Sequence, residues 1–227
     1  MEPSDQAPEQ VALPSASIII PTFNRRERLR RLLTGLAAEY RAGARFDAVV
    51  VDDGSTDGTD AMLAKLVTPF PVQALQQDNA GPAAARNRAI AAATGEVMIF
   101  LDDDVVPGAH LIERHLHAHM LHPRGVVFGP MLPPPGRALP PWLAWEAATL
   151  QKQYLAMQQG RYAPTPRQFF TANASVRKRD IDAARGFDEQ LRRAEDVELG
   201  YRLHSIGLTF HFIANAYVVH TLSLIHI

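Results

Sequence analysis

The sequence predicts an α/β fold, with a mostly parallel central sheet, helices on both faces and a smaller, less regular region in its second half. The first hundred residues carry this prediction, because short β-branched runs alternate with helical repeats of apolar residues. Such alternation is typical of a parallel sheet with right-handed crossovers. Two of the predicted strands also end in aspartates, at residues 52–53 and 102–104. Because ligands of parallel sheets gather at the carboxyl ends of the strands, we expect the functional site there.

The predicted elements of the first half are short and well bounded. A strand at 16–20 is stopped by Pro21 and leads to a helix at 25–41, whose leucines recur at helical spacing among arginines. The remaining elements alternate in the same way: strands at 46–51, 72–75 and 97–101, and helices at 59–66 and 83–93.

The second half is less regular, because proline clusters at 133–135 and 140–141 interrupt it. We predict helices at 110–121, 179–185 and 195–206, and strands at 125–131, 168–176, 208–213 and 216–219. The two ends differ from the body. Residues 1–15 are polar and proline-rich, as in a disordered lead-in, whereas residues 221–227 stay apolar, as in a truncated fragment or a non-native terminus.

Composition places the chain among soluble globular proteins, with 47% apolar and 21% charged residues in 227. The net charge of −1 gives no electrostatic reason to expect nucleic acid as a partner. With no cysteine, a disulfide framework is impossible and a reducing compartment is allowed. No apolar run approaches the ~20 residues that a membrane span needs.

Three consecutive carboxylates, Asp102, Asp103 and Asp104, follow the apolar strand at 97–101. Burying carboxylates without partners is costly, so they are best tolerated where the strand opens onto a cation or a polar ligand. Continued extended backbone would point Asp102 and Asp104 to one side and Asp103 to the other. Such a pair suits Mg²⁺ or Mn²⁺. The alternative is an exposed acidic loop.

Seven short motifs occur in a recognisable order. They are residues 18–25 (IIIPTFNR), 49–57 (VVVDDGSTD), 85–87 (ARN), 100–104 (FLDDD), 172–178 (ANASVRK), 186–189 (GFDE) and 195–203 (EDVELGYRL). Together they resemble the family-2 glycosyltransferases with a GT-A fold, and the likeness covers roughly residues 17–220. The resemblance implies a Rossmann-like sheet in one domain over 16–220, with a nucleotide-sugar-binding half at 16–107 and an acceptor-side half at 108–220.

The resemblance also implies where the donor binds. Pro21, Thr22 and Phe23 would contact the nucleotide, with Phe23 stacking on the base, and Asp53 would accept a base N–H. Arg86, near a helix entry, would attract the pyrophosphate. Three alternatives stay open: Phe23 could be a core residue, Asp53 could shape the turn at Gly54, and Arg86 could lie on a solvated helix face.

The implied metal is Mn²⁺ or Mg²⁺, held by Asp104 through the diphosphate complex, while Asp102 contacts the donor ribose or the water shell of the ion. Few protein ligands are needed when phosphates complete the shell. The family often places a metal-binding histidine at the position of His220, although a single histidine is as often structural.

The catalytic assignment falls on the acidic pair at the start of the last predicted helix. Asp196, or as the second choice Glu195, would act as general base on the acceptor hydroxyl. The alternative is that both acids only enrich the first turn of the helix, where negative charge is favourable.

Acceptor recognition is assigned to Asn173, in the family motif, and to Trp142 and Trp145, which could line one helix face with Leu150 and Tyr154. The tryptophans could stack on sugar, bind a partner or lipid, or belong to a plain helix core. His115, His119 and His122 also share a helix face. We interpret them as a partly exposed histidine-rich face, because nothing completes a zinc site.

We therefore expect an enzyme that moves a sugar from a nucleotide-diphosphate sugar, with a UDP-sugar as first choice, to an acceptor hydroxyl with inversion. The acceptor would be a glycan, a lipid-linked molecule or another hydroxyl compound in polysaccharide or glycoconjugate synthesis. We expect a cytoplasmic location, with peripheral association at the inner face of the membrane as an option. The alternatives are a non-catalytic nucleotide-sugar-binding module and a nucleotidyltransferase.

Overall fold

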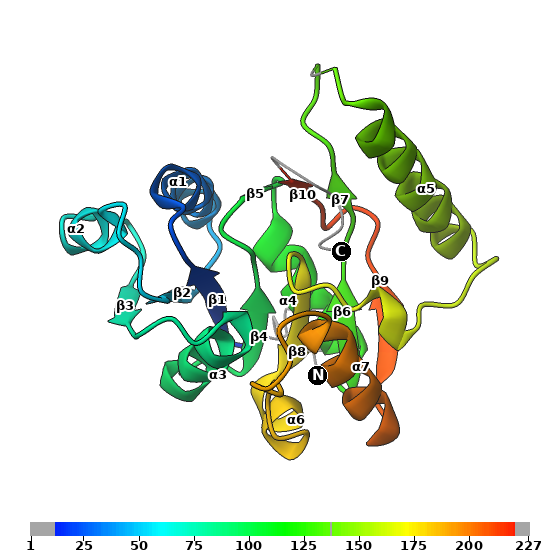
Figure 1. Ribbon diagram of the computed structural model, residues 1–227. Coiled ribbons are helices and arrows are strands. Elements are labelled where there is room, and N and C mark those ends of the chain that lie inside the picture. Colours follow the sequence, from blue (N-terminus) through cyan, green and yellow to red (C-terminus); the bar gives the residue numbers. More distant parts are fainter. Residues whose placement is uncertain (1–11, 137, 221–227) are drawn as a thin grey trace, which may run out of the picture.

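The computed structural model describes residues 12–136 and 138–220. A seven-stranded sheet lies at its centre, with helices around it (Figure 1). The predictions for residues 1–11 and 221–227 lie outside the described residues. The strand order is β3-β2-β1-β4-β8-β6-β9. Only β8 runs antiparallel to its neighbours in this sheet. The strands are β1 (Ala16–Thr22), β2 (Asp47–Asp52), β3 (Val72–Gln76), β4 (Val97–Phe100), β6 (Gly125–Phe128), β8 (Ala174–Arg177) and β9 (Thr209–Phe212).

Helices cover both faces of this sheet, as the sequence predicts. One face carries α1 (Arg26–Arg41), α2 (Thr59–Ala64) and α4 (Leu111–Leu121). The other carries α3 (Pro82–Ala92), α6 (Lys178–Ala183) and α7 (Glu195–Ser205). Helix α5 (Pro141–Gln158) lies beside β9, and a 3₁₀ turn, η1, spans Pro166–Gln168.

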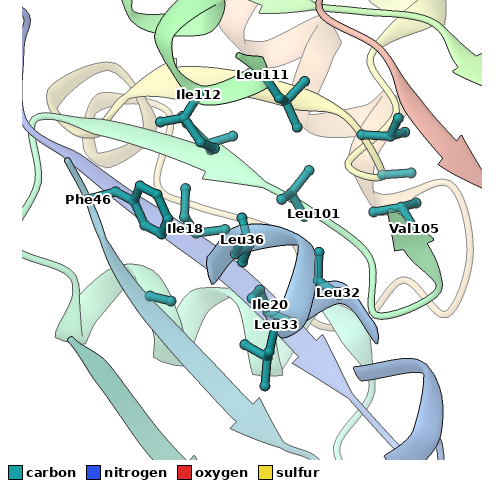
Figure 2. Close-up of a cluster of buried hydrophobic side chains, with 14 of the residues drawn as sticks. Ile18, Ile20, Leu32, Leu33, Leu36, Phe46, Leu101, Val105, Leu111 and Ile112 are labelled. Atoms are coloured by element: carbon teal, nitrogen blue, oxygen red, sulfur yellow. The ribbon is translucent and has the colours of Figure 1, made fainter. Parts of the chain in front are cut away.

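The leucine stripe of α1 explains why this helix packs where it does. Leu32, Leu33 and Leu36 are buried against Ile18 and Ile20 of β1 (Figure 2). Full burial of one such side chain contributes about 1.5–3 kcal/mol. This packing holds β1 in the sheet, so that the residues at its carboxyl end have a fixed position.

A second, three-stranded sheet brings the end of the described chain to the acidic run. It consists of β5 (Val105–Pro107), β10 (Val218–His220) and β7 (Met131–Leu132). Strand β10 pairs antiparallel with β5, and His220 lies opposite Val105. Because Val105 directly follows Asp104, this register places His220 beside the acidic run.

Two predicted strands are wrong in extent. The strand expected at 125–131 is divided into β6 and β7 at Gly129, where a side chain would collide with the carbonyl oxygen of Ala216. The strand expected at 168–176 is a 3₁₀ turn and an irregular segment before β8 begins at Ala174. Within the described ranges, no helix is both long and apolar enough to cross a membrane.

Candidate active site

A cleft of about 640 Å³ opens where β1, β2 and β4 end, at the edge of the sheet where the sequence predicts the site. Its walls come from both halves of the chain, because α3 and the segment leading into α7 both contribute. The predicted site residues that line it are Pro21, Thr22, Phe23, Asp53, Arg86, Asp102, Glu195, Asp196 and His220.

The two aspartates at the end of β2, Asp52 and Asp53, make different hydrogen bonds. Asp52 accepts a hydrogen bond from the backbone N–H of Ser55 at 3.0 Å and so closes the turn around Gly54, whose φ is +84°. Asp53 instead accepts bonds from the loop that leads into α3: from Gln77 Nε2 at 2.7 Å and from the N–H groups of Ala80 and Gly81 at 2.9 and 2.8 Å. The turn-forming alternative for Asp53 is therefore wrong, since Asp52 makes the turn.

Phe23 is 45% exposed and lines the cleft, so the core-residue alternative is wrong for it. Its neighbour Thr22 is buried and donates its hydroxyl hydrogen to Asp103 at 2.8 Å. The end of β1 thus presents an exposed ring on one side and a bonded hydroxyl on the other.

Asp103 does not point away from its neighbours, which corrects the expectation from extended backbone. Strand β4 ends at Phe100, so strict alternation is lost before the acidic run. Asp103 lines the cleft, and one guanidinium nitrogen of Arg25 lies 3.0 Å from Asp103 and 2.9 Å from Asp104. Burial raises the pKa of Asp103 to about 6, against the opposing effects of Arg25 and Thr22.

Asp104 and His220 form a pair that fits a divalent ion. Both side chains are buried, and Asp104 Oδ1 lies 3.2 Å from His220 Nε2. Neighbouring ligands of an octahedral ion with bonds of about 2.1 Å are roughly 3 Å apart, so these two atoms can bind one ion side by side. Among the described residues no cluster of three or more histidine or carboxylate side chains is poised for a metal. An ion here would take its other ligands from phosphate and water.

The protonation state of Asp104 suits this task. Burial alone would raise its pKa, but the hydrogen bond and charge of His220 and the charge of Arg25 outweigh burial, so the pKa lies below its ordinary value. An ionised carboxylate is the form that binds a metal.

Arg86 joins the two halves of the site. It is buried, and its Nη2 lies 2.9 Å from Asp102 Oδ1 while its Nη1 lies 2.7 Å from Glu195 Oε1. The alternative of a solvated helix face is therefore wrong for Arg86. We call Arg86, Asp102 and Glu195 the Arg86 cluster.

Asp196 borders this cluster and faces the cleft. Burial raises the pKa of its carboxyl, and the charge of Arg86 lowers it in part. The carboxylate of Glu195 is held by Arg86. Of the two predicted acids, Asp196 is thus the one better placed to receive a proton.

Three arginines of the cleft were not assigned a role from the sequence: Arg25, Arg192 and Arg193. Two signals could have identified them. Arg25 is the last residue of the first motif, and the arginine pair is separated from the acidic pair of α7 only by Ala194. Arg192 and Arg193 are exposed at the cleft.

The predicted acceptor residues lie outside the cleft. Asn173 is buried, donates to the carbonyl oxygens of Pro130 and Ala216 at 3.2 and 2.8 Å, and lies 3.0 Å from His115 through its own amide oxygen. Trp142 and Trp145 are 61% and 72% exposed, because α5 buries Leu143 and Leu150 instead. A shared core face with Leu150 is therefore wrong for the two tryptophans.

The interpretation of the histidines of α4 as a partly exposed face is wrong for His115 and His119. Both are fully buried, and the Ser175 hydroxyl lies 2.8 Å from a ring nitrogen of each. Burial lowers the pKa of His115 to about 4 and that of His119 to about 3. We call His115, His119, Asn173 and Ser175 the histidine cluster.

Comparisons with known proteins identify the family and the fold of the chain. The family model described as glycosyl transferase family 2 matches residues 17–186. The uncharacterized glycosyltransferase YfnE of Bacillus subtilis (strain 168) is 28% identical over 90% of this chain and 64% of its own. The validoxylamine A glucosyltransferase of Streptomyces hygroscopicus subsp. limoneus is 32% identical over 86% of this chain and 49% of its own. The chain thus spans between about half and two thirds of these relatives.

Two solved structures share the fold. The mannosyltransferase PcManGT from Pyrobaculum calidifontis, in complex with GDP-Man and Mn²⁺, superimposes with a TM-score of 0.73 at 21% identity, covering 97% of this chain and 60% of that one. S. aureus TarS 1-349 in complex with UDP gives 0.72 at 23%, covering 92% and 61%. These likenesses confirm the expected GT-A fold. Because the family model covers most of its length, the chain belongs to glycosyltransferase family 2.

Proposed function

We propose that this domain transfers a sugar from a nucleotide-diphosphate sugar, with a UDP-sugar as first choice, to an acceptor hydroxyl with inversion and with Mn²⁺ or Mg²⁺ bound. One observation carries the proposal. A single cleft is lined by the half-buried carboxylate of Asp196 and by His220, whose ring nitrogen lies 3.2 Å from the buried carboxylate of Asp104. Sugar transfer needs a base and a metal site within reach of one substrate.

The donor base would lie between Phe23 and Asp53. The exposed ring of Phe23 offers a face for stacking. An ionised carboxylate has about four acceptor positions. Three of those on Asp53 are taken by Gln77, Ala80 and Gly81, two on Oδ1 and one on Oδ2. The remaining position on Oδ2 is available for a base N–H.

The leaving diphosphate would lie next to Asp104 and His220. When bound there, the divalent ion acts as a Lewis acid that stabilises the negative charge of the departing diphosphate. Asp104 and His220 would hold the ion, and Arg25, 2.9 Å from the second oxygen of Asp104, would orient that carboxylate. Asp102, at the edge of the same cleft, would contact the donor ribose.

Asp196 would take the proton of the acceptor hydroxyl as that oxygen attacks the anomeric carbon. Attack from the side opposite to the leaving diphosphate inverts the configuration in one displacement. A positioned base contributes ~10²–10⁴-fold in rate. The acceptor would be a glycan, a lipid-linked molecule or another hydroxyl compound in polysaccharide or glycoconjugate synthesis. The site of action would be cytoplasmic, including the inner face of the membrane.

A thermal-shift panel tests the proposal directly. UDP-, GDP- and dTDP-sugars are added with and without Mn²⁺, and turnover is measured for each donor that raises the melting temperature. We expect at least one donor to stabilise the protein in a Mn²⁺-dependent manner and to be hydrolysed or transferred. The variant Asp104→Asn should lose the Mn²⁺-dependent shift. Full activity of that variant would contradict the proposed metal site, and binding without any turnover would favour the non-catalytic module.

A further inference from the structure

Arg86 makes contacts that a simple phosphate ligand would not need. Its two terminal nitrogens reach Asp102, which follows β4, and Glu195, the first residue of α7, at 2.9 and 2.7 Å. Its guanidinium carbon lies 5.6 Å from the centre of the Phe187 ring. The side chain is buried, so its charge is compensated by these carboxylates rather than by water.

The next residue of α3 holds the same segment. Asn87 accepts a hydrogen bond from the N–H of Phe187 at 2.8 Å and donates to the Phe187 carbonyl oxygen at 2.9 Å. A side chain on Gly186, whose φ is +67°, would approach Asn87 Oδ1 to 2.6 Å. Two consecutive residues of α3 thus fix the segment 187–195 at its two ends, directly before Asp196.

Both positive and negative side chains surround Asp196. Arg86 from α3 faces it, together with two carboxylates: Glu195 on its own helix and Asp102 after β4. His220, Arg192 and Arg193 line the same cleft. With Arg86 removed, the two carboxylates would act on Asp196 without the buried positive charge.

We propose that Arg86 is a positioning residue for the transfer reaction: it ties the donor-side Asp102 to the first turn of α7 and supplies the buried positive charge that faces Asp196. The inference rests on the proposed function, because it takes Asp196 to be the general base. It differs from a phosphate-binding role, in which Arg86 would contact the donor itself.

Two variants separate the charge of Arg86 from its geometry. Arg86→Gln removes the charge but keeps hydrogen-bond donors, so the acidic limb of the pH profile of kcat should move up by about 1–3 pH units. Arg86→Lys keeps the charge but lacks the planar fork that reaches both carboxylates. It should leave that limb in place and lower kcat, on the order of 10²-fold, through misplacement of α7.

Matched variants complete the design. Arg88→Gln, at an exposed arginine of the same helix, should leave the profile unchanged. Glu195→Gln removes one of the carboxylates and should move the limb to lower pH, which tests the charge argument even if Arg86→Gln fails to fold. Carbon-13 NMR titration of Asp196, assigned with Asp196→Asn, follows its pKa without requiring turnover.

Binding measurements distinguish a positioning role of Arg86 from a phosphate-binding role. They compare the nucleoside with the nucleoside diphosphate, using the base of the donor that stabilises the protein in the thermal-shift panel. A positioning residue acts through Asp102, so Arg86→Lys should weaken both ligands by the same factor. Loss of diphosphate binding with nucleoside binding retained would overturn the inference, as would an unchanged Asp196 titration in Arg86→Gln. A wild-type protein that turns over no nucleotide sugar would refute the proposed function instead, while the NMR titration would still report on Arg86 and Asp196.

Discussion

The Arg86 cluster and the histidine cluster bury polar groups to a similar degree but in opposite electrical states. In the first, two carboxylates are balanced by a guanidinium, and the cluster opens onto the cleft. In the second, burial lowers the pKa of His115 and His119 far below neutrality, so both rings are uncharged and their partners are neutral. The comparison teaches that burial of polar residues alone does not indicate function. Buried charge that faces a cleft is the stronger indication of a functional site, because keeping such a charge costs stability.

The largest expected effect is on the charged side of this comparison. Asp196→Asn should lower kcat by about 10²–10⁴-fold, because the carboxylate that we propose as the general base is lost. The melting temperature should change little, since the amide occupies the same volume. Initial rates at saturating donor and Mn²⁺, together with thermal melts, measure both quantities.

A control on the same helix turn separates catalysis from helix electrostatics. Glu198 pairs with Arg202 at 2.6 Å and does not line the cleft. Glu198→Gln should therefore keep its rate. If Glu198→Gln lost as much activity as Asp196→Asn, the acids of α7 would act by stabilising the helix electrostatically, and Asp196 would not be the general base.

The second expected effect is a loss of stability when the histidine cluster is disrupted. His115→Ala should lower the free energy of unfolding by about 3 kcal/mol, because it leaves a cavity and removes partners from Asn173 and Ser175. Donor binding by the folded fraction should persist. Urea unfolding monitored by circular dichroism measures the loss. His117→Ala, at an exposed position of α4, is the control and should stay within about 0.5 kcal/mol of wild type.

Features that depend on local sequence patterns were predictable, whereas contacts between residues distant in the sequence were not. Alternation of strands and helices is local, so the core of the sheet and the aspartates at its strand ends were predictable. The motifs also identified Arg86, Asp102 and Glu195 separately. Their mutual pairing was not predictable, because Arg86 and Glu195 are 109 positions apart and meet only when the fold brings the first residue of α7 to the side chain of Arg86.

Other errors have equally specific causes. Helical spacing correctly placed His115 and His119 on one face, but whether that face was buried depended on Ser175 of β8, a distant partner. The orientation of Asp103 depended on where β4 ends. Strand β5 has three residues, too few for a periodic pattern, and it was not predicted. Its pairing with β10, which overlaps the strand predicted at 216–219, places His220 beside Asp104.

A further effect on stability should appear as the pH is lowered. The histidine cluster binds protons more weakly folded than unfolded, since the pKa of His115 is about 4 in the protein and about 6.5 in an unfolded chain. The unfolded state therefore takes up more protons below pH 6.5, and stability should fall as the pH drops from about 6.5 towards 4, by about 1.4 kcal/mol per unit for each histidine. Urea midpoints across this range measure it. A His115→Ala, His119→Ala double variant should lose this slope, and a slope that persisted would assign the acid sensitivity elsewhere.

The smallest effect on stability is expected at a surface that belongs to neither cluster. Trp145 is 72% exposed on α5 and does not line the cleft, so Trp145→Ala should change the free energy of unfolding by less than about 0.5 kcal/mol and leave donor hydrolysis intact. If the tryptophans serve an acceptor, the KM for that acceptor should rise while the rate of donor hydrolysis stays constant. Leu150→Ala, on the buried face of the same helix, should give the reverse result, with a loss of stability and an unchanged acceptor KM in the folded protein. If both variants changed stability and acceptor KM in the same way, the assignment of acceptor binding to α5 would be wrong. A solvent-facing ring and a core side chain of one helix can have the same effect only by disturbing the fold.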